Sequence, residues 1–333
     1  MANGTIALVG GESLLGREIR ELAEAAGLEL RLVAGDEDAE GSLTRLGDEP
    51  AVMAGLRAAS LSGARAAILA GGPHSAKKAL NLLGDPPESP VIDLTYTAEE
   101  LPGARLRAPS VEDGEVSAHE ADLHTVAHPA AIAMALFLRR LQRNDPLRRA
   151  VIQVFVPASE HGTAGVEELK EQTVALLTFK QMTQAVFGAQ LGFNLLSGFG
   201  KEAPQTLELA ELRIERHLAT LLALEGEGVG APMPSLRLVQ APVFHGYSFS
   251  AWVEFAEPPE LEALEESLAG AGIEVRGEEF DPPTAVGQAG QSGISVGPIV
   301  PDRNSASACW FWFVADNLRL HAENAVAVAR GIE

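Results

Sequence analysis

A glycine-rich segment near the start of the chain has residue types that could hold a phosphate group. It follows the apolar run 5–9 and reads Gly10-Gly11-Glu12-Ser13-Leu14-Leu15-Gly16. Dinucleotide-binding turns use three glycines, which permit the tight turn, the close approach of the pyrophosphate and helix packing. Gly10 and Gly16 match the outer positions, and Ser13 takes the middle one. The segment predicts such a turn, although the two glycines would also serve a turn that only packs a helix.

Acidic residues limit which phosphate group this turn could accept. Glu12 places a carboxylate where phosphate oxygens would lie, opposing the favourable helix N-terminus. Asp36 follows the next apolar run, where an acid accepts a ribose 2′-hydroxyl and repels a 2′-phosphate. Four of the residues 36–40 are acidic and none is arginine, so we expect any dinucleotide to bind weakly, with NAD preferred over NADP. The alternative interpretation is that these charges are only a solvated surface segment with no ligand. The candidate cofactor contacts are Gly10, Gly11, Glu12, Ser13, Leu14, Asp36, Gly71 and Gly72.

Two further groups of polar residues could do chemistry. His119, Asp122, His124 and His128 lie near Glu112 and Glu120, and imidazoles and carboxylates are metal ligands. Their spacing matches no metal-site signature, so we expect no metal site. Ser159-Glu160-His161 contains a possible nucleophile and base, but no third orienting acid is identifiable, and a surface loop is the simpler interpretation.

The elements that must position these residues fall into two patterns. The apolar runs 5–9, 28–34, 66–70 and 91–94, with helical spacing over 14–26, predict β-α-β units and a parallel sheet. Residues 109–128 are mostly polar, and we expect them to be irregular and to form a crossing between domains. Beyond them, strands expected at 151–156, 236–243, 247–255 and 310–314 mix with helices expected at 166–177, 206–224 and 318–332.

We therefore predict an α/β protein with a Rossmann-like, doubly wound parallel sheet and a second α+β domain. The first domain should cover residues 1–127 and be completed by the C-terminal helix 316–333, whereas 128–315 should form the second.

Composition excludes several classes of partner. The 333 residues include 25 Lys and Arg against 46 Asp and Glu, a formal charge of −21, which disfavours nucleic acid and anionic membranes as partners. Cys309 is the single cysteine, so no intrachain disulfide can form. We see no membrane-spanning run or secretory signal and expect a cytoplasmic protein.

A series of landmarks, in order along nearly the whole chain, resembles the aspartate-semialdehyde dehydrogenase family. They are the Gly10 turn, Ala70-Gly71-Gly72, Val91-Ile92-Asp93, Val126–Ile132, Phe193–Leu196, Ala241–Ser248, Val314–Arg319 and Asn324-Ala325-Val326. The resemblance implies a homodimer joined through the second domain, a place in amino-acid biosynthesis, and reduction of an acyl phosphate with NADPH through a cysteine thioester, with a histidine as acid and base.

The same resemblance implies that the reacting residues have been replaced. The cysteine position in the family's P-N-C-S-T-I-like segment falls on Pro129, and the glutamine position falls on Val156. Gln240 replaces the substrate-binding arginine and Tyr247 replaces the catalytic histidine. The segment that supplies a phosphate-binding arginine reads Thr95-Tyr96-Thr97-Ala98-Glu99, and Cys309 lies in the wrong segment to act as the nucleophile.

Two hypotheses of function follow from these replacements. The first is a non-catalytic homologue retained for small-molecule binding, dimerisation or regulation. The alternative is an NAD(P)-dependent oxidoreductase acting on an aldehyde or oxo group, with a site rebuilt around Tyr247 and His128, near His245. The aromatic run Trp310-Phe311-Trp312-Phe313 should present large side chains to both faces of a strand, which implies cover by the core on one face and by helices or a second subunit on the other.

Overall fold

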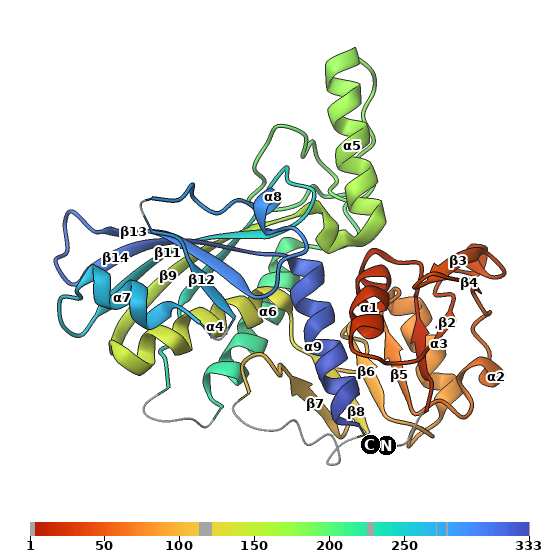
Figure 1. The fold of residues 1–333 in the computed structure, drawn as a ribbon. Coiled ribbons are helices and arrows are strands. Elements are labelled where there is room, and N and C mark those ends of the chain that lie inside the picture. Colours follow the sequence, from red (N-terminus) through yellow and green to blue (C-terminus); the bar gives the residue numbers. More distant parts are fainter. Residues whose placement is uncertain (1–3, 113–121, 225–229, 271, 278, 333) are drawn as a thin grey trace. The chain divides into compact units, whose positions relative to one another are not determined.

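The computed structural model describes residues 4–332 except 113–121, 225–229, 271 and 278 (Figure 1). The chain divides into two compact units. The first comprises Met1–Ala127 together with His321–Glu333, and the second comprises His128–Leu320. Among the helices that the structure describes, none has both the length and the apolar character needed to cross a membrane.

A six-stranded parallel sheet forms the centre of the first unit. Its strand order is β2 (Leu30–Val33), β1 (Ile6–Val9), β5 (Ala66–Leu69), β6 (Val91–Asp93), β8 (Leu123–Val126) and β7 (Ala104–Arg107). The remaining elements are α1 (Leu14–Ala25), η1 (Glu37–Ala39), the hairpin β3 (Leu43–Leu46) and β4 (Glu49–Val52), α2 (Ala58–Leu61), α3 (Pro73–Leu83) and most of α9 (Asn317–Gly331).

Apolar side chains bury the central strands of this sheet on both faces. Ile6 and Leu8 of β1 pack in one cluster with Ile19 of α1 and Ala325 of α9, whereas Ala7 and Val9 pack in a second cluster that contains Ala76 and Ala79 of α3. Continuous apolar runs are typical of parallel strands covered on both faces, because neighbouring side chains point to opposite faces. The predicted doubly wound parallel sheet is confirmed.

The second unit is built on a mixed sheet. Its order is β10 (Ser235–Gln240), β9 (Leu147–Val156), β11 (Tyr247–Phe255), β14 (Ala308–Ala315), β13 (Ile294–Pro301) and β12 (Ile273–Val275), with parallel pairs at the two edges and antiparallel pairs between. The helices are α4 (Pro129–Asn144), η3 (Ala158–His161), α5 (Gly162–Thr178), α6 (Leu207–Leu222), α7 (Leu261–Leu268) and α8 (Ala285–Gln288). The α/β prediction with a second domain of mixed strands is therefore confirmed.

Aromatic packing attaches α4 to one face of the mixed sheet. The Phe137 ring stacks on Phe313 at a centroid distance of 4.6 Å and meets Phe311 edge-on at 5.1 Å. Phe313 also stacks on Phe249 of the neighbouring strand at 4.3 Å. All four rings are buried, so they form the centre of this unit's core.

The sequence prediction was wrong about part of the segment 109–128. Leu123–Val126 is not irregular but forms β8, which lies between β6 and β7 in the parallel sheet. This strand contains His124 and Thr125, and both are buried. Polar residues inside a short segment conceal a buried strand, because the apolar run by which such strands are recognised is interrupted. Strands β7 and β13 and the hairpin of β3 and β4 were also not predicted.

We expect the Phe313→Ala substitution to lower the free energy of unfolding by about 3–5 kcal/mol, because it leaves a cavity between Phe137 and Phe249. Urea unfolding followed by circular dichroism measures the change. The matched control is Leu43→Ala on β3, where the side chain is 81% exposed and the cost should stay within about 0.5 kcal/mol. Equal losses in the two variants would contradict this description of the core.

Candidate functional site

Three glycines meet where strands β1, β2 and β5 end, at the edge where open α/β sheets hold ligands. Gly10 has a φ of +86°, and a Cβ there would overlap the backbone nitrogen of Gly71. A Cβ on Gly35 would lie 3.0 Å from the Cα of Gly10, and one on Gly71 would lie 2.5 Å from Oγ of Ser75 on α3. Side chains at these positions would separate the strand ends, so the glycines permit the close approach of the three loops.

Glu12 and Asp36 of the predicted cofactor site bind the protein's own backbone. Glu12 Oε1 accepts hydrogen bonds from the N–H groups of Gly35 and Asp36, both at 2.8 Å. The Asp36 carboxylate accepts from Asp38 N–H at 3.1 Å and so caps η1. Both acids therefore have structural partners inside the loop that follows β2.

Three other predicted cofactor contacts, Ser13, Leu14 and Gly72, lie at the starts of helices. Ser13 is the N-cap of α1: its hydroxyl accepts from Gly16 N–H at 2.8 Å and donates to the Ala70 carbonyl at 2.7 Å. Leu14 is the first residue of that helix, and Gly72 is the N-cap of α3. The structure thus brings Gly10, Ser13 and Gly71 together at one edge of the sheet.

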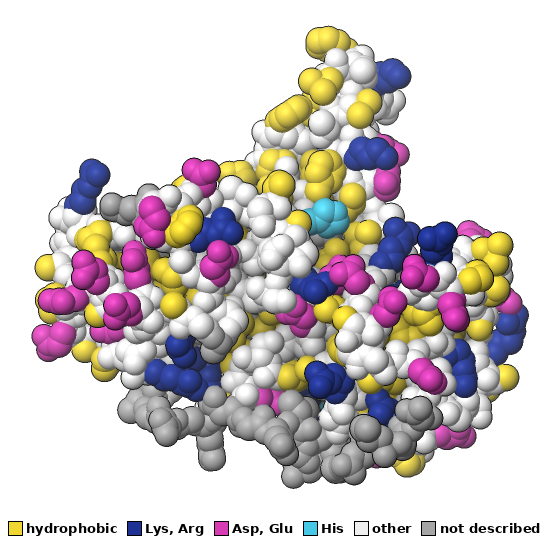
Figure 2. Space-filling model, viewed as in Figure 1, with side chains coloured by type: hydrophobic (Ala, Val, Ile, Leu, Met, Phe, Trp, Pro, Cys, Tyr) yellow, Lys and Arg dark blue, Asp and Glu magenta, His cyan; other side chains and the backbone are white. Residues whose placement is uncertain are grey.

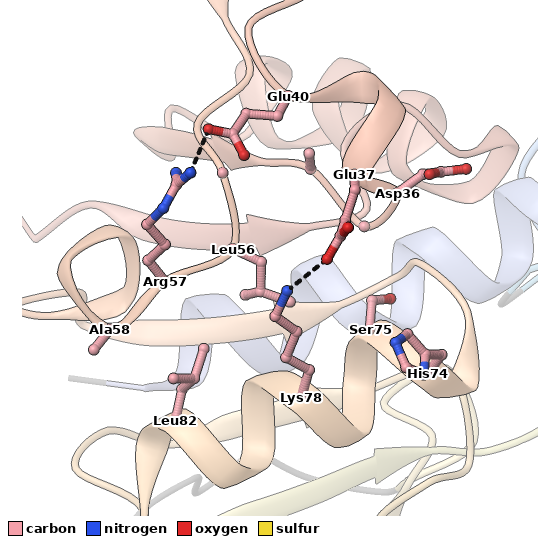
Figure 3. Close-up of a pocket in the computed structure, with 13 residues that line it drawn as sticks. Asp36, Glu37, Glu40, Leu56, Arg57, Ala58, His74, Ser75, Lys78 and Leu82 are labelled. Carbon is pink, nitrogen blue, oxygen red and sulfur yellow. Dashed lines mark hydrogen bonds and ion pairs between the residues drawn. The ribbon is translucent and has the colours of Figure 1, made fainter.

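A pocket of about 490 Å³ lies beside the acidic loop (Figure 3). Two ion pairs span it: Arg57 to Glu40 at 2.7 Å and Lys78 to Glu37 at 3.1 Å. Figure 3 shows Lys78 reaching from α3 toward Glu37 and Arg57 reaching toward Glu40. The sequence prediction treated the loop as acidic without cations, and it missed these two because they come from segments well beyond the loop.

In the second unit, His128, Glu160 and Tyr247 form a hydrogen-bonded group. The Tyr247 hydroxyl donates to Glu160 Oε2 at 2.5 Å, and His128 Nε2 lies 2.9 Å from Glu160 Oε1. His128 is the N-cap of α4, where its Nδ1 accepts from Ala130 N–H at 3.2 Å, which requires Nδ1 to be unprotonated. In that form the ring proton is on Nε2 and faces Glu160. The backbone N–H of His128 donates in turn to Nδ1 of His217 on α6 at 2.9 Å.

This environment keeps the Glu160 carboxylate ionised. Burial alone would raise its pKa, but the electrostatic attraction of the His128 ring and the hydrogen bonds from His128 and Tyr247 outweigh burial and lower the pKa to about 2. At the neighbouring His161, burial dominates and lowers the pKa of the imidazole, which favours its neutral form. The sequence prediction named Tyr247 and His128 but left Glu160 in a loop, because residue spacing does not show that η3 places it between the two.

The remaining sequence-predicted residues surround this group without adding a nucleophile. Pro129 is the first residue of α4, and Val156 ends β9. The Gln240 side chain is buried and donates to the Val156 carbonyl at 2.9 Å. Ser159 pairs not with His161 but with Asn317, whose Oδ1 also accepts from Gly246 N–H at 3.0 Å.

Among the described residues, Cys309 is not placed as a reactive thiol, and no cluster of metal ligands is found. Cys309 is buried on β14, and burial raises the pKa of its thiol to about 11, far from the thiolate form that a nucleophile needs. No group of three or more His, Cys, Asp or Glu side chains is placed to hold a metal ion in the described ranges. His119 and Glu120 of the candidate metal group lie outside those ranges.

We expect Glu160→Gln to change how stability depends on pH. A carboxylate whose folded pKa is about 2, against an ordinary 4.5, adds stability above about pH 4.5, and this contribution disappears as pH falls toward 2. Wild type should therefore exceed Glu160→Gln by on the order of 2–3 kcal/mol at neutral pH and lose that advantage in acid. Urea unfolding at neutral and acid pH measures this difference. A difference independent of pH would contradict the assignment of Glu160 as an ionised, paired group.

Comparison with known proteins gives consistent matches. Residues 138–320 match the semialdehyde dehydrogenase dimerisation domain. The USG-1 protein homolog of Pseudomonas aeruginosa is 34% identical over 233 residues, covering 69% of this chain and 67% of that protein. The structure of a probable aspartate-semialdehyde dehydrogenase from Pseudomonas aeruginosa has a TM-score of 0.78 and 27% identity, and covers 98% of this chain and 97% of that one.

A more distant match shares the fold alone. It is an aspartate-semialdehyde dehydrogenase with NADP from Candida albicans, at a TM-score of 0.69 and 13% identity, covering 99% of this chain and 98% of that one. The matched dimerisation domain spans more than half of the 333 residues, and the parallel and mixed sheets agree with the full-length structural matches. This chain belongs to the semialdehyde dehydrogenase family.

Proposed function

We propose that this chain is a non-catalytic member of the family, retained for small-molecule binding, dimerisation or regulation. The observation that carries the proposal is the His128–Glu160–Tyr247 group. Tyr247 stands at the landmark of the family's catalytic histidine, and its hydroxyl is bound to an internal carboxylate. The Glu160 carboxylate is held by two side chains of the protein, Tyr247 and His128, and no pair of a nucleophile and a base is present in this group.

The missing nucleophile supports the same proposal. By the resemblance, the family's cysteine position falls on Pro129, the first residue of α4. Proline has no thiol, and the single cysteine of the sequence, Cys309, lies on β14. In a serine protease, loss of the nucleophile lowers turnover by on the order of 10⁶-fold, so the replacement by itself would remove the family reaction.

A rebuilt oxidoreductase site is the second candidate, and the same hydrogen bonds favour it. A tyrosine hydroxyl 2.5 Å from a carboxylate that also contacts an imidazole could move a proton to or from a bound oxo group. In that case Tyr247 would be a catalytic residue, and its hydroxyl would be needed for turnover. The two candidates therefore differ in what Tyr247→Phe does to activity.

We expect purified protein to show no turnover of aspartate semialdehyde with inorganic phosphate and NADP or NAD, as measured by reduced-nicotinamide absorbance beside an active family enzyme. Tyr247→Phe should leave this result unchanged and lower stability by about 1–3 kcal/mol, because a hydrogen bond to a charged group is lost. Turnover that requires phosphate and NADP, and that Tyr247→Phe abolishes, would overturn the non-catalytic proposal and support the second candidate.

We propose, in addition, that the chain forms a homodimer through the open face of its mixed sheet. Val151, Trp252, Trp310 and Val300 are register partners on four neighbouring strands and so share one face. Val151, Trp310 and Val300 are 45–46% exposed, whereas Phe311 and Phe313 point to the opposite face beneath α4. An exposed apolar row on a domain matched to a dimerisation family supports burial against a second copy.

We expect size-exclusion chromatography with light scattering to give a dimer for the wild type and a monomer for Trp310→Asp, because an aspartate would bury an unpaired charge in the interface. The matched control is Leu43→Asp on the first unit, an exposed apolar residue on β3 that should leave the dimer intact. A monomeric wild type, or a dimer that survives Trp310→Asp, would refute the proposed interface.

A further inference from the structure

Two adjacent backbone N–H groups in the first unit converge on one acceptor. The N–H groups of Gly35 and Asp36, just after β2, both donate to Glu12 Oε1 at 2.8 Å. Successive N–H groups that point at one place form an anion-binding concavity, of the kind that holds phosphate groups in many proteins. Here the anion is a side chain of the same chain, supplied by the glycine-rich turn.

The fit around this carboxylate is close. A Cβ on Gly35 would lie 3.1 Å from Glu12 Oε1, so the missing side chain lets the carboxylate reach the backbone. The second oxygen, Glu12 Oε2, is buried and has no hydrogen-bond partner among the described residues. The two cations of the neighbouring pocket do not compensate its charge, since Arg57 and Lys78 are paired with Glu40 and Glu37.

We infer that Glu12 is an internal substitute for the phosphate of a ligand and closes the first unit to phosphate-bearing dinucleotides. It takes the N–H pair of Gly35 and Asp36, which would otherwise be available to a phosphate oxygen, and it adds a negative charge where a phosphate would have to lie. A dinucleotide must displace Glu12 or approach it against Coulomb repulsion, so the residues present do not fit the family's cofactor. This inference concerns the first unit and stands apart from the replacements in the second.

Direct titration of Glu12 variants tests the inference. We compare wild type, Glu12→Ala and Glu12→Gln by calorimetry at low salt, using NADP, NAD and adenosine as probes. Glu12→Ala frees both N–H groups and removes the charge, so NADP should bind about tenfold or more tightly than to wild type. Glu12→Gln keeps an acceptor for the two N–H groups without the charge and should gain less. Adenosine has no phosphate, so its affinity should change by less than about threefold.

Two outcomes would overturn the inference. One is that both variants bind NADP with an affinity within about threefold of wild type. The same conclusion holds if neither wild type nor either variant shows detectable binding of NADP. The other is a gain for adenosine as large as that for NADP, which would indicate release of space and not of an anion site. If Glu12→Ala does not fold, the comparison of Glu12→Gln with wild type decides. The titration measures affinity and not catalytic activity. A result that overturns this inference therefore does not bear on the non-catalytic proposal, which the turnover assay tests separately.

Discussion

A carboxylate removed from water must receive hydrogen bonds from inside the protein, and this constraint shapes both units. Charged groups buried without partners cost several kcal/mol, so a buried acid fixes the position of whatever donates to it. Asp93 holds the loop after β6 through the N–H groups of Thr95 and Ala98, and burial raises its pKa despite these bonds. Glu168 of α5 likewise holds the segment at 186–187.

The two acids at the candidate sites follow the same rule with a different consequence. Glu12 is bound by the N–H groups of the loop after β2, and Glu160 is bound by the side chains of Tyr247 and His128. Each carboxylate thus engages hydrogen-bond donors of its own unit. A fold shared with a probable aspartate-semialdehyde dehydrogenase thus remains well packed with these donors engaged from within.

The mixed sheet shows how one strand serves two surfaces. Alternate residues of β14 point to opposite faces, so Phe311 and Phe313 join the core under α4 while Trp310 stays exposed. Asp302 accepts hydrogen bonds from the indole N–H groups of both Trp252 and Trp310, which fixes these rings on the open face. The rigid aromatic row is suited to packing against a matching surface.

The sequence by itself determined the architecture, and it named Tyr247 and His128 of the hydrogen-bonded group in the second unit. Apolar runs ending in Gly10 and Gly71 predict a parallel sheet with a turn at its ligand edge, because only glycine permits loops to approach so closely. The chain has one cysteine, and the resemblance predicts that it lies outside the family's nucleophile segment. Such features depend on local pattern and composition, which a sequence displays directly.

Only the tertiary structure decided which groups meet. Glu160 lies 32 residues from His128 and 87 from Tyr247, and Glu12 lies 23 residues from Gly35, so no local pattern links them. The strand β8 was missed for a related reason, since His124 and Thr125 are polar residues buried by their neighbours in the sheet. Hydrogen bonds between distant residues depend on how strands and loops pack in three dimensions, and spacing along the chain does not encode that packing.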